Sequence, residues 1–409
     1  MGGGPDEALQ GEAVARCASD IESADFVALD LEFSGLFLKT ERDKRILSLE
    51  DLYDKCAESI PEFLPLQLGI CCARKQQEGG LWELRSHEFN LWPQERRIFT
   101  ADLQSLRFLR SHGFDFNAFF HQAFKYNRLP PADMDQGAMM RRLPPTHATR
   151  IMAALRKSRA PLVFHNAMLD LMHLHDKFVG DLPDEYKEFG ESWTTHFPLL
   201  FDTRLIAHEG KYSVLRHAGG LSLEELHKHL SGLPDLPVKF ERGGPLGTGS
   251  AAHGSSGHDA ILTAEVFVMA MDMWLRADAS GSNKRRKKAA PSAGTEPAAE
   301  AAGTAAGDAA TAGQRGDNDG WTVVGRKRPL EASGAAVDAA TAGLASPSLL
   351  ESHEVCRRFH NRIAVMGAAP GVLDLGRPPG LQMPSGLLPP PEGTGPALPG
   401  DVPAVSESA

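Results

Sequence analysis

Phe26-Val27-Ala28-Leu29-Asp30-Leu31-Glu32 (residues 26–32) carries the strongest structural signal in this chain. Consecutive apolar residues are typical of a buried strand, and two carboxylates follow one residue apart. Because side chains at positions i and i+2 leave a strand on the same face, Asp30 and Glu32 are expected to point into one space. Like charges placed so close repel unless a cation or a proton neutralises them. Hard divalent cations that prefer oxygen ligands, Mg²⁺ or Mn²⁺, would do this, whereas a strand edge with two hydrated acids is the simpler alternative.

Composition limits the classes of protein to which the chain can belong. It has 409 residues, 42% hydrophobic content and a formal net charge of -10, which argues against a basic protein that coats nucleic acid. No apolar run reaches the ~18 residues of a membrane helix, so we expect no membrane partner. The N-terminal residues lack the basic and apolar pattern of a secretion signal. The cysteines have no metal-type spacing, which predicts free, mostly buried thiols in a reducing compartment (Cys17, Cys56, Cys71, Cys72 and Cys356).

Hydrophobic periodicity predicts alternating helices and strands between residues 8 and 275. Capping boxes at Ser48 and Ser222 and an N-cap at Asp102 mark helix starts. Strands are expected at 26–32, 63–72, 81–92 (one or two strands), 161–164 and 197–201, and helices at 8–24, after 48, after 102, after 151, after 167, at 223–230 and at 259–274. This alternation indicates one α/β domain with a mixed sheet flanked by helices over 8–275.

Composition changes abruptly after residue 275. Residues 276–348 are rich in Ala and Gly, and they are predicted to form a disordered linker that carries the basic run 284–288. That run fits a nuclear-import signal, with extra RNA attraction or a hydrated charge run as alternatives, so we expect a nuclear and cytoplasmic location. Residues 349–376 are expected to pack back on the domain, and 377–409 to be a disordered Pro/Gly-rich tail.

Further acids fall where they could complete the first pair. Asp170 lies just inside the helix after 167, and Asp259 opens the last helix, where the helix dipole favours a carboxylate. Each could also be a simple helix-start acid, and Asp202 is interpreted as the cap of a helix that begins at Thr203. The order strand Asp-x-Glu, helix Asp, late-helix Asp with a nearby His is more specific. Four such carboxylates can hold two metal ions for in-line hydrolysis of a phosphodiester, with a neutral imidazole taking the proton from water.

The sequence resembles a known family at several separate motifs. They are ADFVALDLEFSG (24–35), GFDFN (113–117), HNAMLDLMH (165–173), FPLLFDTRLIA (197–207) and GHDAILT (257–263). In this order they resemble the poly(A)-specific ribonucleases, members of the DEDDh 3′-exonucleases. The resemblance implies an RNase H-like fold and a magnesium-dependent 3′-to-5′ exoribonuclease that shortens poly(A) and releases 5′-AMP. It also implies that Asp30, Glu32, Asp170 and Asp259 hold two Mg²⁺ ions, for which Mn²⁺ could substitute.

The catalytic histidine remains open between two positions. Family members usually place it five residues before the last Asp, which is Gly254 here, whereas His253 stands six before Asp259. His258 directly precedes Asp259. Because neighbouring side chains on a helix point about 100° apart, His258 is expected to point away from the metals. We favour His253 as the general base over His258; a hydrated loop histidine is the simpler explanation for either.

Substrate contacts rest on weaker signals. Aromatic stacking and cations along the backbone bind single-stranded RNA, and the candidates that also match family segments are Phe33, Ser34, Phe114, Phe116, Asn166 and Arg204. For the phenylalanines, packing in the core is the competing explanation. Adenine preference, binding of poly(A) 3′ ends and a homodimer rest on the resemblance alone.

Longer family members carry RNA-binding modules for which this chain has little room. Residues 127–150 are too short for the inserted RNA-binding domain, and the segment at 359–375 is followed by tail instead of an RNA-recognition domain. We therefore expect a short form without either module. The alternatives are a nuclease that trims the 3′ ends of nuclear non-coding RNA and a non-catalytic RNA-binding protein on the same fold.

Overall fold

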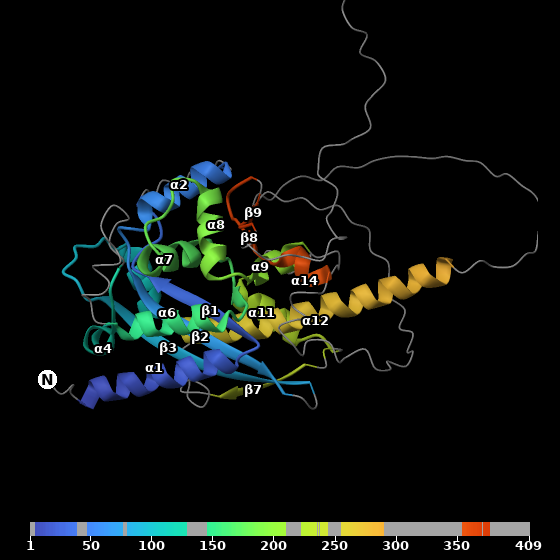
Figure 1. The fold of residues 1–409 in the computed structure, drawn as a ribbon, viewed down its shortest axis with the longest axis horizontal. Coiled ribbons are helices and arrows are strands. Elements are labelled where there is room, and N and C mark those ends of the chain that lie inside the picture. Colours follow the sequence, from blue (N-terminus) through green and yellow to red (C-terminus); the bar gives the residue numbers. More distant parts are fainter. Residues whose placement is uncertain are drawn as a thin grey trace, which may run out of the picture.

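The computed structural model describes residues 5–38, 47–76, 80–128, 145–209, 222–234, 236, 238–243, 255–289, 354–369 and 371–376. The strands of these residues form one seven-stranded mixed sheet, with helices packed on both faces, and a separate two-stranded sheet (Figure 1). The α/β class with a mixed sheet flanked by helices, expected from the sequence, is confirmed.

Strand β1 lies at the centre of the large sheet. The strands follow the order β4-β3-β2-β1-β5-β6, and β7 pairs with β3. Their bounds are β1 (Phe26–Phe33), β2 (Pro65–Lys75), β3 (Leu81–Pro93), β4 (Phe124–Tyr126), β5 (Leu162–Phe164), β6 (Leu200–Asp202) and β7 (Lys239–Gly243). β1 runs antiparallel to β2 and parallel to β5. Sequence reasoning missed β7, because its residues lie in a Gly/Pro-rich stretch and pair only along the outer part of β3.

Three of the described helices start where the sequence predicts a capping residue. Ser48 accepts from the Asp51 N–H, Asp102 from the Gln104 N–H, and Ser222 forms a full capping box with Glu225. The helices are α1 (Pro5–Ser23), α2 (Leu49–Ser59), α3 (Leu103–Ser111), α4 (Phe116–Gln122), α6 (His147–Ser158), α7 (Met168–Phe178), α8 (Tyr186–His196), α9 (Thr203–His208), α11 (Leu223–Ser231), α12 (Ser256–Ala289) and α14 (Glu354–Phe359).

Alternate residues of β1 face two different apolar cores. Phe26 and Ala28 pack toward α12 and its Phe267, whereas Val27 and Leu29 pack into a second core with residues of α1, α6 and α7. Asp30 and Glu32 continue the first series, so they lie on the face that α12 covers. Four described cysteines are free and buried, as predicted, and the neighbours Cys71 and Cys72 belong to opposite cores.

The segment 354–376 lies against the domain. It contains α14 and the antiparallel pair β8 (Arg362–Ala364) and β9 (Val372–Asp374). Asn361 is fully buried, accepts the Leu200 N–H at 2.9 Å and donates to the Pro198 carbonyl at 2.9 Å. This side chain satisfies backbone groups at the start of β6, which would otherwise be buried without partners.

Helix α12 corrects one predicted boundary. The sequence places the end of the last helix at 274 and a disordered linker from 276, but the helix continues to Ala289 and includes the basic run 284–288. Figure 1 shows its C-terminal part extending beyond the packed body. Ala, Lys and Arg, which are frequent between 276 and 289, are good helix formers, so the helix propagates past its last packed turn. The disorder predicted for residues 290–348 and 377–409 falls outside the described residues and stays a prediction.

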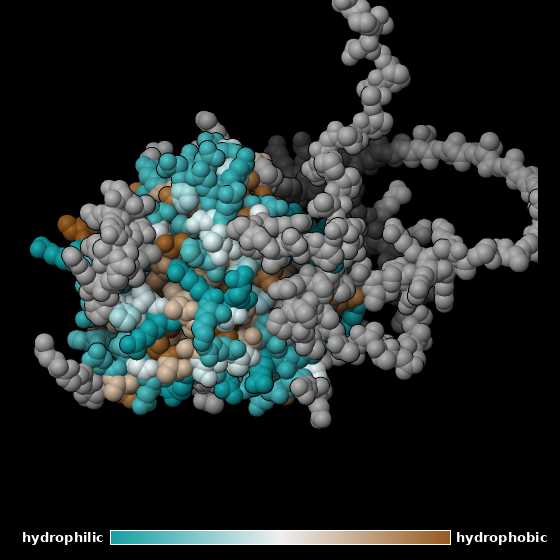
Figure 2. Space-filling view, viewed as in Figure 1, coloured by the Kyte–Doolittle hydropathy of each residue, from teal (hydrophilic) through white to brown (hydrophobic). Residues whose placement is uncertain are grey.

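The face shown in Figure 2 is mostly hydrophilic, with small hydrophobic areas between polar side chains. Among the residues that the structure describes, no helix combines the length and the apolar character that spanning a bilayer requires.

Candidate metal centre

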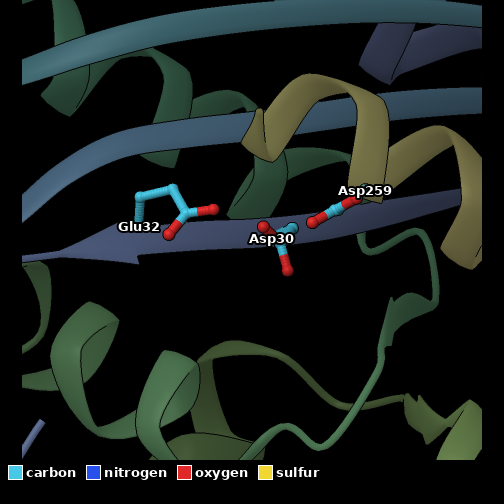
Figure 3. A group of neighbouring side chains, drawn as sticks. All are labelled: Asp30, Glu32 and Asp259. Carbon is cyan, nitrogen blue, oxygen red and sulfur yellow. The ribbon is translucent and has the colours of Figure 1, made fainter. Parts of the chain in front are cut away.

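Three carboxylates from two distant parts of the chain meet on one face of β1. Asp30 and Glu32 leave the strand side by side, and Asp259 reaches them from the first turn of α12 (Figure 3). Ligand oxygens of the three residues all lie within 4.8 Å of one another, and each side chain is half-buried. Three oxygen donors at this separation can share a divalent cation.

Asp170 brings a fourth carboxylate to the same place. It lies in the first turn of α7 with 8% of its surface exposed. Its Oδ1 accepts the backbone N–H of Leu31 at 3.1 Å, the residue between Asp30 and Glu32. This hydrogen bond fixes α7 against β1 and keeps the carboxylate close enough for its charge to act on Asp30 and Glu32.

The carboxyl groups of the cluster have raised pKa values, so bound protons or cations would stabilise them. Burial raises the pKa of Asp30 well above its ordinary value, and the charges of Asp170, Glu32 and Asp259 raise it further. Burial, and then the charges of Asp259 and Asp170, raise the pKa of Glu32 to about 8. Burial raises the pKa of Asp170 to about 8, although its backbone hydrogen bonds oppose the shift. The cluster therefore binds protons or cations near neutral pH, and an all-oxygen donor set suits Mg²⁺ or Mn²⁺.

Asp202 holds the turn that presents Asp170. It caps α9 by accepting the Arg204 N–H at 2.8 Å, which confirms its predicted capping role. The same carboxylate also accepts the N–H groups of Asn166 and Ala167, and that of Ala364 in β8. Asn166 has φ of 64°, a left-handed conformation that Asn tolerates better than most residues. Asp202 thus ties the turn before α7 to the segment 354–376.

The structure does not decide between His253 and His258 as the general base. His253 lies outside the described residues. His258 is half-buried in the first turn of α12, directly before Asp259. Its backbone N–H donates to the Ser255 hydroxyl at 3.3 Å. The choice of general base therefore remains a prediction.

The candidate substrate residues separate into buried and half-buried groups. Ser34 is fully buried, its hydroxyl donates to the Thr100 carbonyl and accepts the Leu64 N–H, and it is therefore a structural residue. Phe33 is 9% exposed and stacks on His173 with ring centroids 4.2 Å apart, so packing accounts for it. The half-buried residues are Phe114 and Phe116, which pack on each other, and Asn166 and Arg204.

Arg204 has a feature that favours a role in binding an anion. Its Nε is buried and has no hydrogen-bond partner among the described residues. A guanidinium N–H left in this state is costly unless a ligand accepts from it.

Sequence reasoning missed the residues on which α12 begins. Gln67 in β2 and Glu88 in β3 accept backbone N–H groups of Ser256 and Gly257. Neither residue belongs to a motif, and only the register of β1, β2 and β3 shows that they share a face with Asp30 and Glu32.

A mixed sheet with clustered carboxylates at its centre is an arrangement that can bind divalent cations and that nucleases use to hydrolyse phosphodiesters. The chain belongs to the CAF1 family of ribonucleases, whose family model matches residues 10–143 and 132–267. This membership confirms the resemblance to DEDDh 3′-exonucleases that the sequence motifs indicated.

Individual relatives match parts of the chain. "Poly(A)-specific ribonuclease PARN" of Danio rerio is 36% identical over 125 residues, which are 29% of this chain and 18% of that protein. "Poly(A)-specific ribonuclease PNLDC1" of Mus musculus is 24% identical over 315 residues, 52% of this chain and 59% of that protein. The chain thus spans less than two thirds of either relative. S. pombe Pop2p, solved in an Mg²⁺- and Mn²⁺-bound form, is similar with 19% identity and a TM-score of 0.43 over 64% of this chain and 88% of that chain.

Proposed function

We propose that this protein is a magnesium-dependent 3′-to-5′ exoribonuclease that shortens poly(A) and releases 5′-AMP. The observation that carries the proposal is the cluster of Asp30, Glu32 and Asp259 on one face of β1, with Asp170 held at the Leu31 N–H between the two strand acids. Family membership supports the ribonuclease class. The poly(A) substrate is supported by the names of relatives that match only part of the chain.

The four acids would hold two Mg²⁺ ions, with Mn²⁺ as a substitute. When bound, the ions would supply an activated water and stabilise the leaving oxygen of the scissile phosphodiester. Asp30 and Glu32 offer carboxylates from a rigid strand, and Asp170 and Asp259 offer theirs from the first turns of two helices. A neutral imidazole, of His253 or His258, would take the proton from the attacking water at its unprotonated ring nitrogen.

The substrate is proposed to be the 3′ end of single-stranded RNA. Arg204 is proposed to contact a phosphate, Asn166 to position the terminal nucleotide, and Phe114 and Phe116 to contact bases. Nuclear and cytoplasmic location is a further proposal that rests on the basic run 284–288. A homodimer is proposed only by analogy with the family.

A cleavage assay tests the function. Purified protein is incubated with 5′-labelled oligo(A), oligo(U) and single-stranded DNA, with Mg²⁺ or with EDTA, beside an Asp30→Ala variant. We expect stepwise shortening of oligo(A) that needs Mg²⁺ and Asp30, with 5′-AMP identified by chromatography. Absence of shortening for every substrate, combined with RNA binding, would support the non-catalytic alternative. Equal shortening of all three would remove the adenine preference and favour a general trimming nuclease.

The same assay identifies the general base. His253→Ala and His258→Ala are compared at saturating Mg²⁺. Loss of a general base lowers the rate by roughly 100-fold or more. Only the variant that lacks the base should show this loss, while the other retains most of the activity.

A further inference from the structure

Helix α12, which carries Asp259, begins directly on the strands that flank the acids. Antiparallel pairing places Gly69 of β2 opposite Asp30, and Glu88 of β3 opposite Gly69. Gln67 lies opposite Glu32 in the same way. Residues opposite each other in an antiparallel pair point to the same face, so all five share the face that α12 covers.

Two side chains on this face hold the first residues of α12. The Gln67 Oε1 accepts both the N–H and the hydroxyl of Ser256 at 3.0 Å, and the Glu88 carboxylate accepts the Gly257 N–H at 3.1 Å. Gln67 is itself oriented, because its Nε2 donates to the Asn90 Oδ1 at 3.0 Å. Gln67 is 5% exposed and Ser256 is fully buried, so water does not compete for the bonds between these two residues.

Gly69 allows the helix to come this close. A Cβ added to Gly69 would lie 1.9 Å from the carbonyl oxygen of Ser256 and 2.6 Å from the Gly257 nitrogen. Both atoms belong to the backbone and cannot rotate away. Any side chain at position 69 would therefore displace the start of α12 from the sheet.

We propose that Gln67, Gly69 and Glu88, here called the α12 seat, position Asp259 for metal binding. The seat holds residues 256 and 257, and the helical backbone transmits that position rigidly to Asp259, whose carboxylate lies within 4.8 Å of those of Asp30 and Glu32. The metal-binding part stands on this geometry, and its effect on RNA cleavage rests on the proposed function. None of the three seat residues is a metal ligand in this proposal.

Gly69→Ala and Gln67→Ala test the seat. Metal affinity is measured by calorimetric titration of the full chain with Mn²⁺. We expect the dissociation constant for Mn²⁺ to rise by about 10- to 100-fold, as for residues that orient metal ligands. Gln67→Ala introduces no collision, so it keeps the test valid if Gly69→Ala fails to fold. An unchanged Mn²⁺ affinity in a folded variant at either position would overturn the proposal.

Gly190→Ala is the matched control for loss of stability. A Cβ there would lie 2.8 Å from the carbonyl oxygen of Leu375, so it also collides with backbone, but in the segment 354–376 and not at α12. We expect a lower melting temperature and a much smaller loss of Mn²⁺ affinity than in Gly69→Ala, because the segment 354–376 reaches the acids only indirectly, through the contacts of Asp202. An equal loss of Mn²⁺ affinity in Gly190→Ala and Gly69→Ala would show that general destabilisation explains both, which would overturn the proposal.

Glu88 needs a separate comparison, because its charge could act on the metal directly. Glu88→Gln keeps an oxygen that can accept the Gly257 N–H but removes the charge, whereas Glu88→Leu removes both. If Glu88 acts through the seat, Glu88→Gln retains Mn²⁺ affinity within about threefold and Glu88→Leu loses about tenfold or more. An equal loss in both variants would assign Glu88 a charge effect and remove it from the seat.

Failure of the seat can be told apart from failure of the proposed function. Mn²⁺ binding by the wild-type chain without shortening of oligo(A) would reject the exonuclease proposal and leave the seat testable by calorimetry. Shortening of oligo(A) by the wild type, together with unaltered Mn²⁺ affinity in the seat variants, would reject only the seat.

Discussion

Replacing Asp30 by Asn should stabilise the metal-free protein while it abolishes metal binding. Ligand oxygens of Asp30, Glu32 and Asp259 lie within 4.8 Å of one another. Two unit charges at such a distance repel by about 3 kcal/mol at an effective dielectric constant of about 20. Protonation already relieves part of this repulsion, as the raised pKa of about 8 for Glu32 indicates. We therefore expect the Asn variant to gain about 1–2 kcal/mol in its free energy of unfolding without metal.

Magnesium should stabilise the wild type but not the Asp30→Asn variant. An ion at one hundred times its dissociation constant stabilises the folded state by about 2.7 kcal/mol. In a domain of roughly 250 residues this raises the melting temperature by about 5–10 °C. We expect that rise for the wild type and almost none for Asp30→Asn, whose shortening of oligo(A) should also fall by about 100-fold or more.

Thermal unfolding at pH 7.5, with EDTA and then with a series of Mg²⁺ concentrations, measures both effects. Glu22→Gln is the control, because Glu22 is an exposed carboxylate whose ion pair with Lys157 lies at the surface. Such an exposed pair contributes little to stability, so this variant should behave as the wild type. A metal-free Asp30→Asn protein that melts below the wild type, and that Mg²⁺ still stabilises fully, would refute the reasoning.

Three other outcomes follow from the described contacts. Asn361→Ala removes the buried partner of the Leu200 N–H and the Pro198 carbonyl, so chemical denaturation should show a loss of about 2–4 kcal/mol; a loss below about 0.5 kcal/mol would contradict the assigned role. Burial lowers the pKa of His175 to about 4 from 6.5, so the unfolded chain binds more protons between these values, and stability should rise with pH from about 4 to 6.5. His175→Gln should flatten this rise in denaturation curves recorded across that range, and an unaltered slope would show that other groups cause it. Arg204→Ala should raise the KM for oligo(A) about tenfold with a smaller change in kcat, and an unchanged KM in steady-state kinetics would remove Arg204 from the substrate contacts.

Much of the fold followed from local patterns. The helix starts at Ser48, Asp102 and Ser222 were predictable, because a capping side chain and its N–H partner lie within three residues of each other. The alternation in β1 likewise predicted that Asp30 and Glu32 share a face. Strand β7 and the continuation of α12 to Ala289 were not predictable, since edge pairing and helix propagation depend on what the rest of the fold leaves available.

For the site, the sequence by itself determined which acids are candidates and in which order they occur. The strand alternation alone identifies Asp30 and Glu32 as a pair. The family resemblance then assigns Asp170 and Asp259 to the same metal site. Only the tertiary structure decided that Ser34 is a structural residue, that Phe33 packs on His173, and that Asp202 joins the turn before α7 to the segment 354–376. It also decided that Gln67, Gly69 and Glu88 lie beneath α12. The physical reason is that these contacts join residues far apart in the chain, and strand register and helix packing, which no short motif encodes, bring them together.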